Sequence, residues 1–329
     1  MTFTKGNLCQ LIVKMETDKN KIEYSLVIPV FNEEGLINEL YRRVTLSMER
    51  LGGAYEVIFV DDGSKDKTFS ILNAIGKKDP RIKILSFSRN FGHHIAITAG
   101  LDFSAGRAVI MMDGDLQDPP EEIIQLNEKF REGYDIVCAI YRSRQDPLLK
   151  RVLGKLFYRV FRIVGKVSIP ENSGIFRMMS REVVDSVKSC REYSRFIVGL
   201  IDWTGFSTAG VEIDRGKRFS GKAKYNFFKS LKLAAYAIIS FSSFPLQLAA
   251  YLGFMFASLS FVAGVYLLVK KIFFDIAVSG YTSIIVSVLF LGGIQLIVLG
   301  VIGEYIGKIY AEVQGRPLYL LKRKVGFEK

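Results

Sequence analysis

Short apolar runs and amphipathic segments alternate along the first half of the chain. The short runs predict strands at 24–30, 55–60, 81–88, 108–112 and 134–140. Between them, apolar residues recur at helical spacing, which predicts helices over 33–51, 67–77, 92–104 and 119–131. Strands that alternate with helices indicate an α/β fold with a mostly parallel, Rossmann-like sheet.

Much longer apolar runs follow towards the end of the chain. No charged residue occurs over the 37 positions 233–269 or the 23 positions 281–303. A transmembrane helix needs about 20 apolar residues, and Pro245 divides the longer run. We predict an interfacial helix over 226–243 and transmembrane helices over 245–269 and 281–303. The alternative, a pair of buried core helices, is disfavoured because two such runs lie next to each other.

Basic residues flank the two predicted spans on their outer sides. Since Lys and Arg concentrate on the cytoplasmic side of membranes, both termini are expected in the cytoplasm. The chain then divides into an N-terminal extension (1–22), a cytoplasmic domain (23–225), the membrane segments and a cytoplasmic C-terminal tail (304–329). Two spans without an ionisable residue argue against a transporter or a channel.

Charge and composition narrow the class of protein further. The chain has 45 Lys and Arg against 33 Asp and Glu, a net charge of +12, yet 49% of its residues are hydrophobic, which excludes a disordered protein. All six charged residues within 147–166 are basic, and the apolar residues there have helical spacing. This pattern favours an amphipathic helix on an anionic membrane surface over a core helix with a basic solvated side. No nucleic-acid-binding module is recognisable, so no nucleic-acid partner is expected.

Polar residues follow the predicted strands at the point where each strand ends. They lie at 32–34, 61–62, 89–90 and 113–115 and at Arg142. Ligands of parallel α/β sheets bind beyond the carboxyl ends of the strands, where these clusters should meet. The sequence therefore predicts one binding site at this edge of the sheet.

The cluster Asp113-Gly114-Asp115 indicates a divalent metal. Two carboxylates one residue apart, followed by the oxygen of Gln117, suit Mg²⁺ or Mn²⁺ that also contacts substrate phosphates. The alternative is that these residues cap the helix that opens at Pro119. Asp118 alone would suffice as that cap, which leaves the other two carboxylates available.

Two further clusters are open to more than one interpretation. Asp61 and Asp62 either form a turn with a helix cap or accept hydrogen bonds from a base or ribose. His93 and His94 are adjacent, and neighbours on a helix point about 100° apart, so both cannot face one metal. We place the two histidines at a helix N-terminus near the nucleotide.

Taken together, the motifs resemble the inverting family-2 glycosyltransferases of GT-A fold. The most similar subgroup is the polyprenyl-phosphate glycosyltransferases, which include dolichol-phosphate mannose synthases and bactoprenol glucosyltransferases. The motifs that carry the resemblance are Val-Ile-Pro-Val-Phe-Asn-Glu-Glu (27–34), Val-Asp-Asp-Gly-Ser (60–64), Ser-Arg-Asn-Phe-Gly (88–92) and Asp-Gly-Asp-Leu-Gln-Asp-Pro-Pro (113–120). The likeness extends over nearly the whole chain.

The resemblance implies a UDP- or GDP-sugar donor, a divalent metal, and undecaprenyl or dolichyl phosphate as the acceptor. It also implies a homo-oligomer in contact with membrane lipids. By this likeness, the nucleotide would be held by Pro29, Asn32, Glu34, Asp61, Asp62 and Asn90. The metal and the diphosphate would be held by Asp113, Asp115 and Gln117.

Basic residues beside the predicted site are the candidates for binding the acceptor phosphate. Arginine matches phosphate geometry, and Arg142 and Arg144 follow the fifth predicted strand. Arg218, Lys222 and Lys224 precede the interfacial helix, at the depth of a lipid phosphate. We expect Asp113, Asp115 and Arg142 to act in catalysis. The alternative is that some of these basic residues only fix the membrane orientation.

One position departs from the family pattern. Relatives often have Asn-x-Gly-Asp-Phe-Arg where this chain has Ile175 in place of the acidic residue, so a general base in that role is in doubt. A phosphate monoester already carries roughly −1.5 to −2 charge near pH 7 and is a ready nucleophile.

Two rival functions remain. A processive polysaccharide synthase would usually carry a Gln-x-x-Arg-Trp motif, whereas the only Trp here is Trp203. A catalytically silent membrane scaffold is supported mainly by Ile175.

Overall fold

The computed structural model divides the chain into two units. It describes residues 22–142, 170, 172–193, 195–214, 216, 244–274 and 280–327. The first unit contains Met1–Tyr225 together with Pro317–Lys329, and the second contains Asn226–Arg316. The C-terminal residues therefore belong to the same unit as the N-terminal α/β fold, although the sequence assigned them only to a tail.

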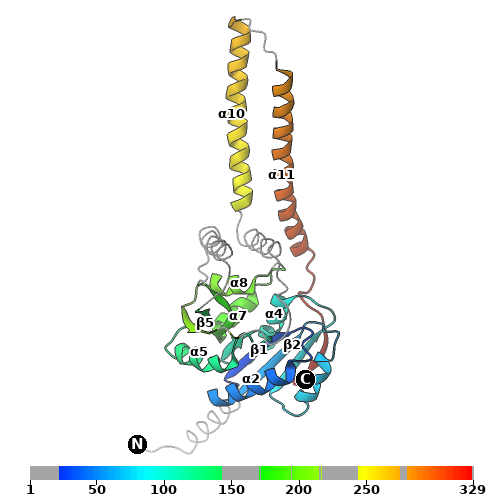
Figure 1. The fold of residues 1–329 in the computed structure, drawn as a ribbon, viewed down its shortest axis with the longest axis vertical. Helices are drawn as coiled ribbons and strands as arrows, with labels where there is room; N and C mark the ends of the chain where they lie inside the picture. Colours follow the sequence, from blue (N-terminus) through cyan, green and yellow to red (C-terminus); the bar gives the residue numbers. More distant parts are fainter. Residues whose placement is uncertain are drawn as a thin grey trace, which may run out of the picture. The chain divides into compact units, whose positions relative to one another are not determined.

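Four parallel strands form the centre of the first unit (Figure 1). In spatial order they are β4 (Ala108–Met111), β1 (Tyr24–Val30), β2 (Tyr55–Asp61) and β3 (Ile82–Phe87). Every residue of β1 and β2 is buried. Strands covered on both faces have continuous apolar sequences, which is why these runs could be recognised. The predicted α/β fold with a parallel centre is confirmed.

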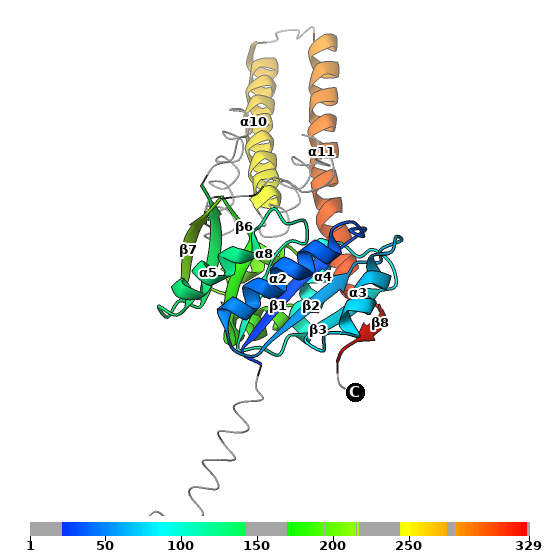
Figure 2. The same ribbon diagram turned by 60° about the horizontal axis from the view of Figure 1, so that its bottom comes forward.

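Further strands extend the sheet on both sides. β6 (Ser173–Ser180) pairs antiparallel with β4 and with β5 (Ile136–Tyr141), and β7 (Thr208–Ile213) pairs parallel with β5. On the opposite side, β8 (Leu321–Val325) pairs antiparallel with β3. Figure 2 shows β8 in red at this edge of the sheet. The full order is β7-β5-β6-β4-β1-β2-β3-β8, so the sheet is mixed at both sides of its parallel centre.

Helices cover both faces of the sheet. The first face is covered by α2 (Ile37–Leu51), α3 (Thr68–Gly76) and α5 (Ile123–Phe130), with α2 in front of β1 in Figure 2. The second face is covered by α4 (His93–Phe103), α7 (Arg181–Ser189) and α8 (Ile197–Trp203). In α2 the buried residues include Ile37, Leu40, Val44 and Met48, which recur at helical spacing.

The segment before α5 differs from its prediction. A short 3₁₀ turn, η1 (Pro120–Glu122), precedes the helix, and its N-terminal neighbour is Pro119. Asp118 was expected to cap this helix, but it is fully buried, and its Oδ1 accepts a hydrogen bond from the Tyr141 hydroxyl at 2.7 Å. Asp118 thus ties this segment to β5 and does not cap the helix.

The second unit consists of two long apolar helices, α10 (Phe244–Phe274) and α11 (Tyr281–Val313). They contain the stretches Leu246–Leu267 and Phe290–Val313, with mean hydropathies of 1.9 and 1.7, which are long and apolar enough to cross a membrane. The aromatic rings of Phe256 and Phe290 meet edge to face at 5.9 Å. The predicted spans fall within these helices, and α11 continues ten residues beyond its predicted end. The predicted helices at 147–166 and 226–243 lie outside the described residues.

Candidate active site

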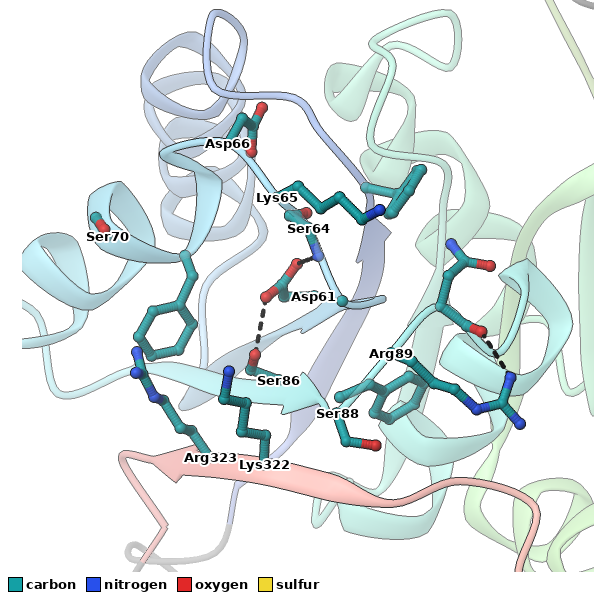
Figure 3. Close-up of a pocket in the computed structure, with 15 residues that line it drawn as sticks. Asp61, Ser64, Lys65, Asp66, Ser70, Ser86, Ser88, Arg89, Lys322 and Arg323 are labelled. Carbon is teal, nitrogen blue, oxygen red and sulfur yellow. Dashed lines mark hydrogen bonds between the residues drawn. The ribbon is translucent and has the colours of Figure 1, made fainter.

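The loops that follow β1, β2 and β3 surround a pocket of about 610 Å³ (Figure 3). Its walls include Phe31, Asp61, Ser64, Ser86, Arg89 and, from β8, Lys322 and Arg323. A volume of this size suits a small-molecule ligand. Asp61, Arg89 and Asn90, from two of the polar clusters predicted at the strand ends, thus meet in this pocket, and a strand that the sequence did not predict completes the wall.

Asp61 is a fixed acceptor inside this pocket. Its side chain is 1% exposed, its Oδ1 accepts the Ser64 backbone N–H at 2.9 Å, and its Oδ2 accepts the Ser86 hydroxyl at 2.8 Å. Each carboxylate oxygen has a second lone pair, so Asp61 can still accept a hydrogen bond from a ligand. The arrangement suits the nucleotide role expected for this residue.

Asp62, the next residue, has a different environment. Its carboxylate accepts the backbone N–H groups of Phe91 at 2.7 Å and Gly92 at 3.0 Å. Burial raises the pKa of Asp62, and these two hydrogen bonds oppose the shift. The contacts hold the loop between β3 and α4, and the nucleotide contact expected for Asp62 stays a prediction.

Asn32 and Glu34 join two loops to each other. The Asn32 backbone N–H donates to the Ser64 hydroxyl, and the Asn32 Oδ1 accepts the Lys65 N–H, both at 2.9 Å. The Glu34 Oε2 similarly accepts the Lys67 N–H at 2.9 Å. These bonds keep residues 32–34 out of the helix, which begins at Ile37 and not at residue 33 as predicted. Both residues remain exposed.

A glycine allows the two loops after β2 and β3 to approach. Gly63 has a φ of +70°, and a Cβ there would lie 2.5 Å from the Arg89 carbonyl carbon. We expect Gly63→Ala to lower the free energy of unfolding by more than the roughly 1–2 kcal/mol that a left-handed backbone costs, because the Arg89 backbone must also move. Nucleotide affinity should fall with it, as measured by thermal unfolding and nucleotide titration.

Gly205→Ala is the matched control for that substitution. Gly205 has a φ of +76° with no atom within 4 Å of its Cβ position, so only the backbone cost applies. Equal losses of stability in the two variants, with nucleotide affinity unchanged, would contradict the role given to Gly63.

The Asp113–Gln117 segment alternates between partly exposed and buried residues. Asp113, Asp115 and Gln117 are partly exposed, whereas Gly114 and Leu116 are buried. A Cβ on Gly114 would lie 2.9 Å from the Pro29 carbonyl oxygen, so the close approach to β1 requires glycine. The Asp115 Oδ1 accepts the Gln117 backbone N–H at 3.1 Å. Three oxygen-bearing residues of the segment are therefore partly accessible to solvent.

These residues fit a divalent cation that takes part of its coordination from phosphates. Among the described residues, no group of three or more His, Cys, Asp or Glu side chains could hold a metal ion by itself. Mg²⁺ is commonly bound through one or two carboxylates together with substrate phosphates. The Asp113 and Asp115 carboxylates and the Gln117 amide oxygen are donors of that kind.

His93 is a site residue for which the sequence gave no specific contact. It lies at the start of α4, and its Nε2 is 3.2 Å from the Asp113 Oδ1. Loss of water around the ring lowers the pKa of His93, while the carboxylates of Asp62 and Asp115 oppose the shift. The only sequence feature that pointed to His93 was its position shortly after the polar cluster at 89–90. A neutral imidazole at this distance can donate to Asp113 and orient it.

His94 points elsewhere, as the helical geometry predicts. Its ring packs edge to face on Phe196 at 5.6 Å, and the loss of water lowers the pKa of His94 to about 4. His94 is therefore neutral at physiological pH and contributes to packing. The two adjacent histidines serve different parts of the fold.

The residues proposed for the acceptor phosphate are only partly described. Arg142 is 57% exposed. Its Nε lies 3.3 Å from Glu212 Oε2, and its guanidinium lies 3.8 Å from Asp214 Oδ2.

The remaining candidate residues lie in different places. Asn90 lines the pocket, and Pro29 is buried within β1. Ile175 lies half-buried in β6. Arg144, Arg218, Lys222 and Lys224 lie outside the described residues.

Comparison with known proteins tests the resemblance carried by these motifs. A model described as glycosyl transferase family 2 matches residues 25–188, and one described as the GtrB C-terminal hairpin matches residues 244–309. The glycosyltransferase YkcC of Bacillus subtilis, described as uncharacterized, is 44% identical over 93% of this chain and 95% of its own length. The chain belongs to glycosyl transferase family 2. This glycosyltransferase has the predicted GT-A fold.

Other relatives are similar in both units. The SfII prophage-derived bactoprenol glucosyl transferase of Shigella flexneri is 46% identical over 92% of this chain and 98% of its own. Among solved structures, glucosyl-3-phosphoglycerate synthase of Mycobacterium tuberculosis, in complex with Mn²⁺, UDP and phosphoglyceric acid, matches with a TM-score of 0.49. It is 19% identical, with coverage of 69% of this chain and 80% of that one. The match to the GtrB C-terminal hairpin and the identity to the bactoprenol glucosyl transferase confirm the likeness of this glycosyltransferase to the polyprenyl-phosphate subgroup.

Proposed function

We propose that this glycosyltransferase moves a sugar, with inversion, from a UDP- or GDP-sugar to a polyprenyl phosphate such as undecaprenyl or dolichyl phosphate. The observation that carries the proposal is the shared edge on which the Asp61 pocket and the Asp113–Gln117 segment lie. One part suits a nucleoside and the other a diphosphate. The printed activity of the Shigella flexneri relative, a bactoprenol glucosyl transferase, supports the same acceptor class.

The residues around the diphosphate have separable tasks. A Mg²⁺ or Mn²⁺ ion held by Asp113, Asp115 and Gln117 would neutralise the charge that develops on the leaving diphosphate. His93 would keep the Asp113 carboxylate oriented through its 3.2 Å contact. Asp62 would hold the loop that leads to His93, through the Phe91 and Gly92 N–H groups. Catalysis then depends on positioning and on charge stabilisation.

The acceptor needs little chemical activation. One phosphate oxygen attacks the anomeric carbon, the bond from that carbon to the diphosphate oxygen breaks, and the configuration inverts. Since the phosphate monoester is already ionised at neutral pH, Ile175 in place of an acidic residue is compatible with this reaction. The function also accounts for two long apolar helices in the same chain. We propose that both termini and the catalytic unit lie on the cytoplasmic side, in agreement with the flanking basic residues.

A product assay tests the function directly. Membranes that contain the chain would be incubated with radiolabelled UDP- and GDP-sugars, undecaprenyl or dolichyl phosphate, and Mg²⁺ or Mn²⁺. The expected products are a lipid-linked monosaccharide and an equal amount of nucleoside diphosphate. A polymer would instead indicate a processive synthase, and no product with any donor would indicate a silent scaffold.

Arg142 provides a prediction for the acceptor side. Its exposed pairs with Glu212 and Asp214 are worth at most about 1 kcal/mol, so an acceptor phosphate can compete for the guanidinium. We expect Arg142→Ala to raise the KM for the lipid phosphate about tenfold and to leave the KM for the donor unchanged. Glu212→Gln, which removes a competing carboxylate, should leave the acceptor KM equal or lower. A rise in donor KM alone would contradict this assignment.

A further inference from the structure

The strand that follows the second apolar helix is a built part of the catalytic unit. The Ser88 backbone N–H donates to the Leu320 carbonyl at 3.0 Å, and the Tyr319 hydroxyl donates to Asp102 Oδ2 at 2.8 Å. The Tyr319 ring stacks on Phe87 at 5.2 Å, and Phe327 packs on Phe103 at 5.3 Å. Contacts on both sides of β8 therefore fix its register against β3.

This register sends the basic residues of β8 to different environments. Lys324 lies with its Nζ 4.7 Å from the Phe103 ring and 4.9 Å from the Phe327 ring, among the residues that anchor the strand. Arg323 lines the pocket but rests over the Phe69 ring at 4.5 Å. Lys322 also lines the pocket, and Figure 3 shows its side chain pointing towards Ser86 and Asp61.

We propose that Lys322 is a donor-recognition residue, and that its ammonium and the Asp61 carboxylate together select a keto nucleobase. The inference rests on the proposed function and specifies the nucleotide that the function leaves open. The Lys322 ammonium offers only hydrogen-bond donors, and the Asp61 carboxylate offers acceptors. The wall of the pocket thus presents one donor and one acceptor side by side.

Base chemistry converts this pair into a preference. Uracil presents an N3–H beside the O4 carbonyl, and guanine presents an N1–H beside the O6 carbonyl, so either base can donate to Asp61 and accept from Lys322. Cytosine and adenine present the reverse order, with a ring nitrogen that accepts and an amino group that donates. Two acceptors would then face each other at Asp61 and two donors at Lys322, which costs binding energy because neither polar group is satisfied.

Asp61 is held in the orientation that this selection requires. The bonds from the Ser64 N–H and the Ser86 hydroxyl fix both carboxylate oxygens, so the acceptor does not need to reorganise on binding. Ser86 also pairs with Arg323 in the β3–β8 register, so the same pair of strands positions both members. The second member of the pair comes from a segment about 260 residues further along the chain, beyond the family model that matches residues 25–188.

Nucleotide binding by the purified full-length protein in detergent micelles tests the inference without the acceptor. UDP, GDP, CDP and ADP would be titrated by calorimetry in the presence of Mg²⁺ or Mn²⁺. We expect UDP or GDP to bind at least about tenfold more tightly than CDP and ADP. Lys322→Met should weaken that keto-base nucleotide about tenfold, since one charge-assisted hydrogen bond is lost. CDP and ADP should bind equally well or more tightly, because the two facing donors at Lys322 are removed.

Lys324→Met is the matched control, because it removes the same charge from the same strand away from the pocket. It should leave all four dissociation constants unchanged, and the melting temperature of each variant would establish that the strand remains in place. Equal weakening of all four nucleotides by Lys322→Met would overturn the inference and assign Lys322 to phosphate. Binding without base preference would overturn the inference alone, whereas no binding of any nucleotide would overturn the proposed function as well.

Discussion

Asp115→Ala is expected to abolish transfer of sugar from the nucleotide donor to polyprenyl phosphate. In the proposed function, Asp115 is one of two carboxylates that would hold a metal ion against the diphosphate, and metal stabilisation of a leaving group is worth several kcal/mol. Because each 1.4 kcal/mol is a factor of ten, we expect the rate to fall at least about a thousandfold. Initial rates with radiolabelled donor measure the loss, and Mn²⁺ binding followed by electron paramagnetic resonance gives an independent measurement.

Two companion variants separate the charge of Asp115 from its effect on the loop. Asp115→Asn keeps an oxygen that can accept the Gln117 N–H but removes the negative charge, so it should also be inactive. Asp185 lies in α7, and its exposed carboxylate is 3.6 Å from the Arg181 guanidinium. Asp185→Ala removes this carboxylate and should retain full activity. Full activity of Asp115→Ala would exclude the metal assignment.

Arg177→Met is expected to cause the largest loss of stability. The Arg177 side chain is fully buried, and its Nη1 lies 2.8 Å from the Oδ1 of Asp202, whose side chain is 2% exposed. Breaking a buried pair leaves an uncompensated charge and costs about 3–5 kcal/mol. For a domain of this size the melting temperature should fall by about 10 °C, as measured by differential scanning fluorimetry in detergent.

The loss should depend on pH in a defined direction. Burial raises the pKa of Asp202, and Arg177 opposes that shift, so the pKa should rise further in the variant. A carboxyl group whose pKa is higher in the folded than in the unfolded protein favours the folded state when it is protonated. This contribution to the free energy of unfolding is lost as pH rises through the folded-state pKa. The difference between wild type and Arg177→Met should therefore be smaller at pH 5 than at pH 8.

A second substitution provides the control for this interpretation. Asp202→Leu in the Arg177→Met background removes the unpaired carboxylate and should restore part of the lost melting temperature. No recovery in the double variant, together with no pH dependence in the single variant, would show that Arg177 acts through other contacts. Those contacts are hydrogen bonds to the Gly174 carbonyl at 3.2 Å and the Ser173 hydroxyl at 3.3 Å.

The strands that the sequence predicted are those dominated by buried apolar side chains. β1 to β4 are covered on both faces, and their bounds agree with the predicted runs to within one or two residues. β6 carries the buried Arg177, β7 alternates between exposed and half-buried residues, and β8 reads Leu-Lys-Arg-Lys-Val. In these three strands, charged or exposed residues interrupt the hydrophobic pattern. The strands could therefore be recognised only from the tertiary structure.

The position of the site was predictable, but the orientation of its side chains was not. Polar residues at strand ends located the pocket and the Asp113–Gln117 segment. Asp61 and Asp62 are neighbours of the same type, yet one faces the pocket and the other binds the backbone at Phe91. Which of them meets a ligand depends on the loop after β3, and that loop is fixed by contacts with residues far away in the sequence. The partnership of His93 with Asp113 has the same origin.

The last strand of the sheet, β8, is also the last to be synthesised. A ribosome translates α10 and α11 before it reaches β8, whereas β3 has emerged more than 200 residues earlier. During translation the outer edge of β3 lacks its partner, and the wall that carries Lys322 does not yet exist. The nascent chain therefore completes its sheet only after both apolar helices have been made. The pocket around Asp61 therefore gains its last wall only at the very end of translation.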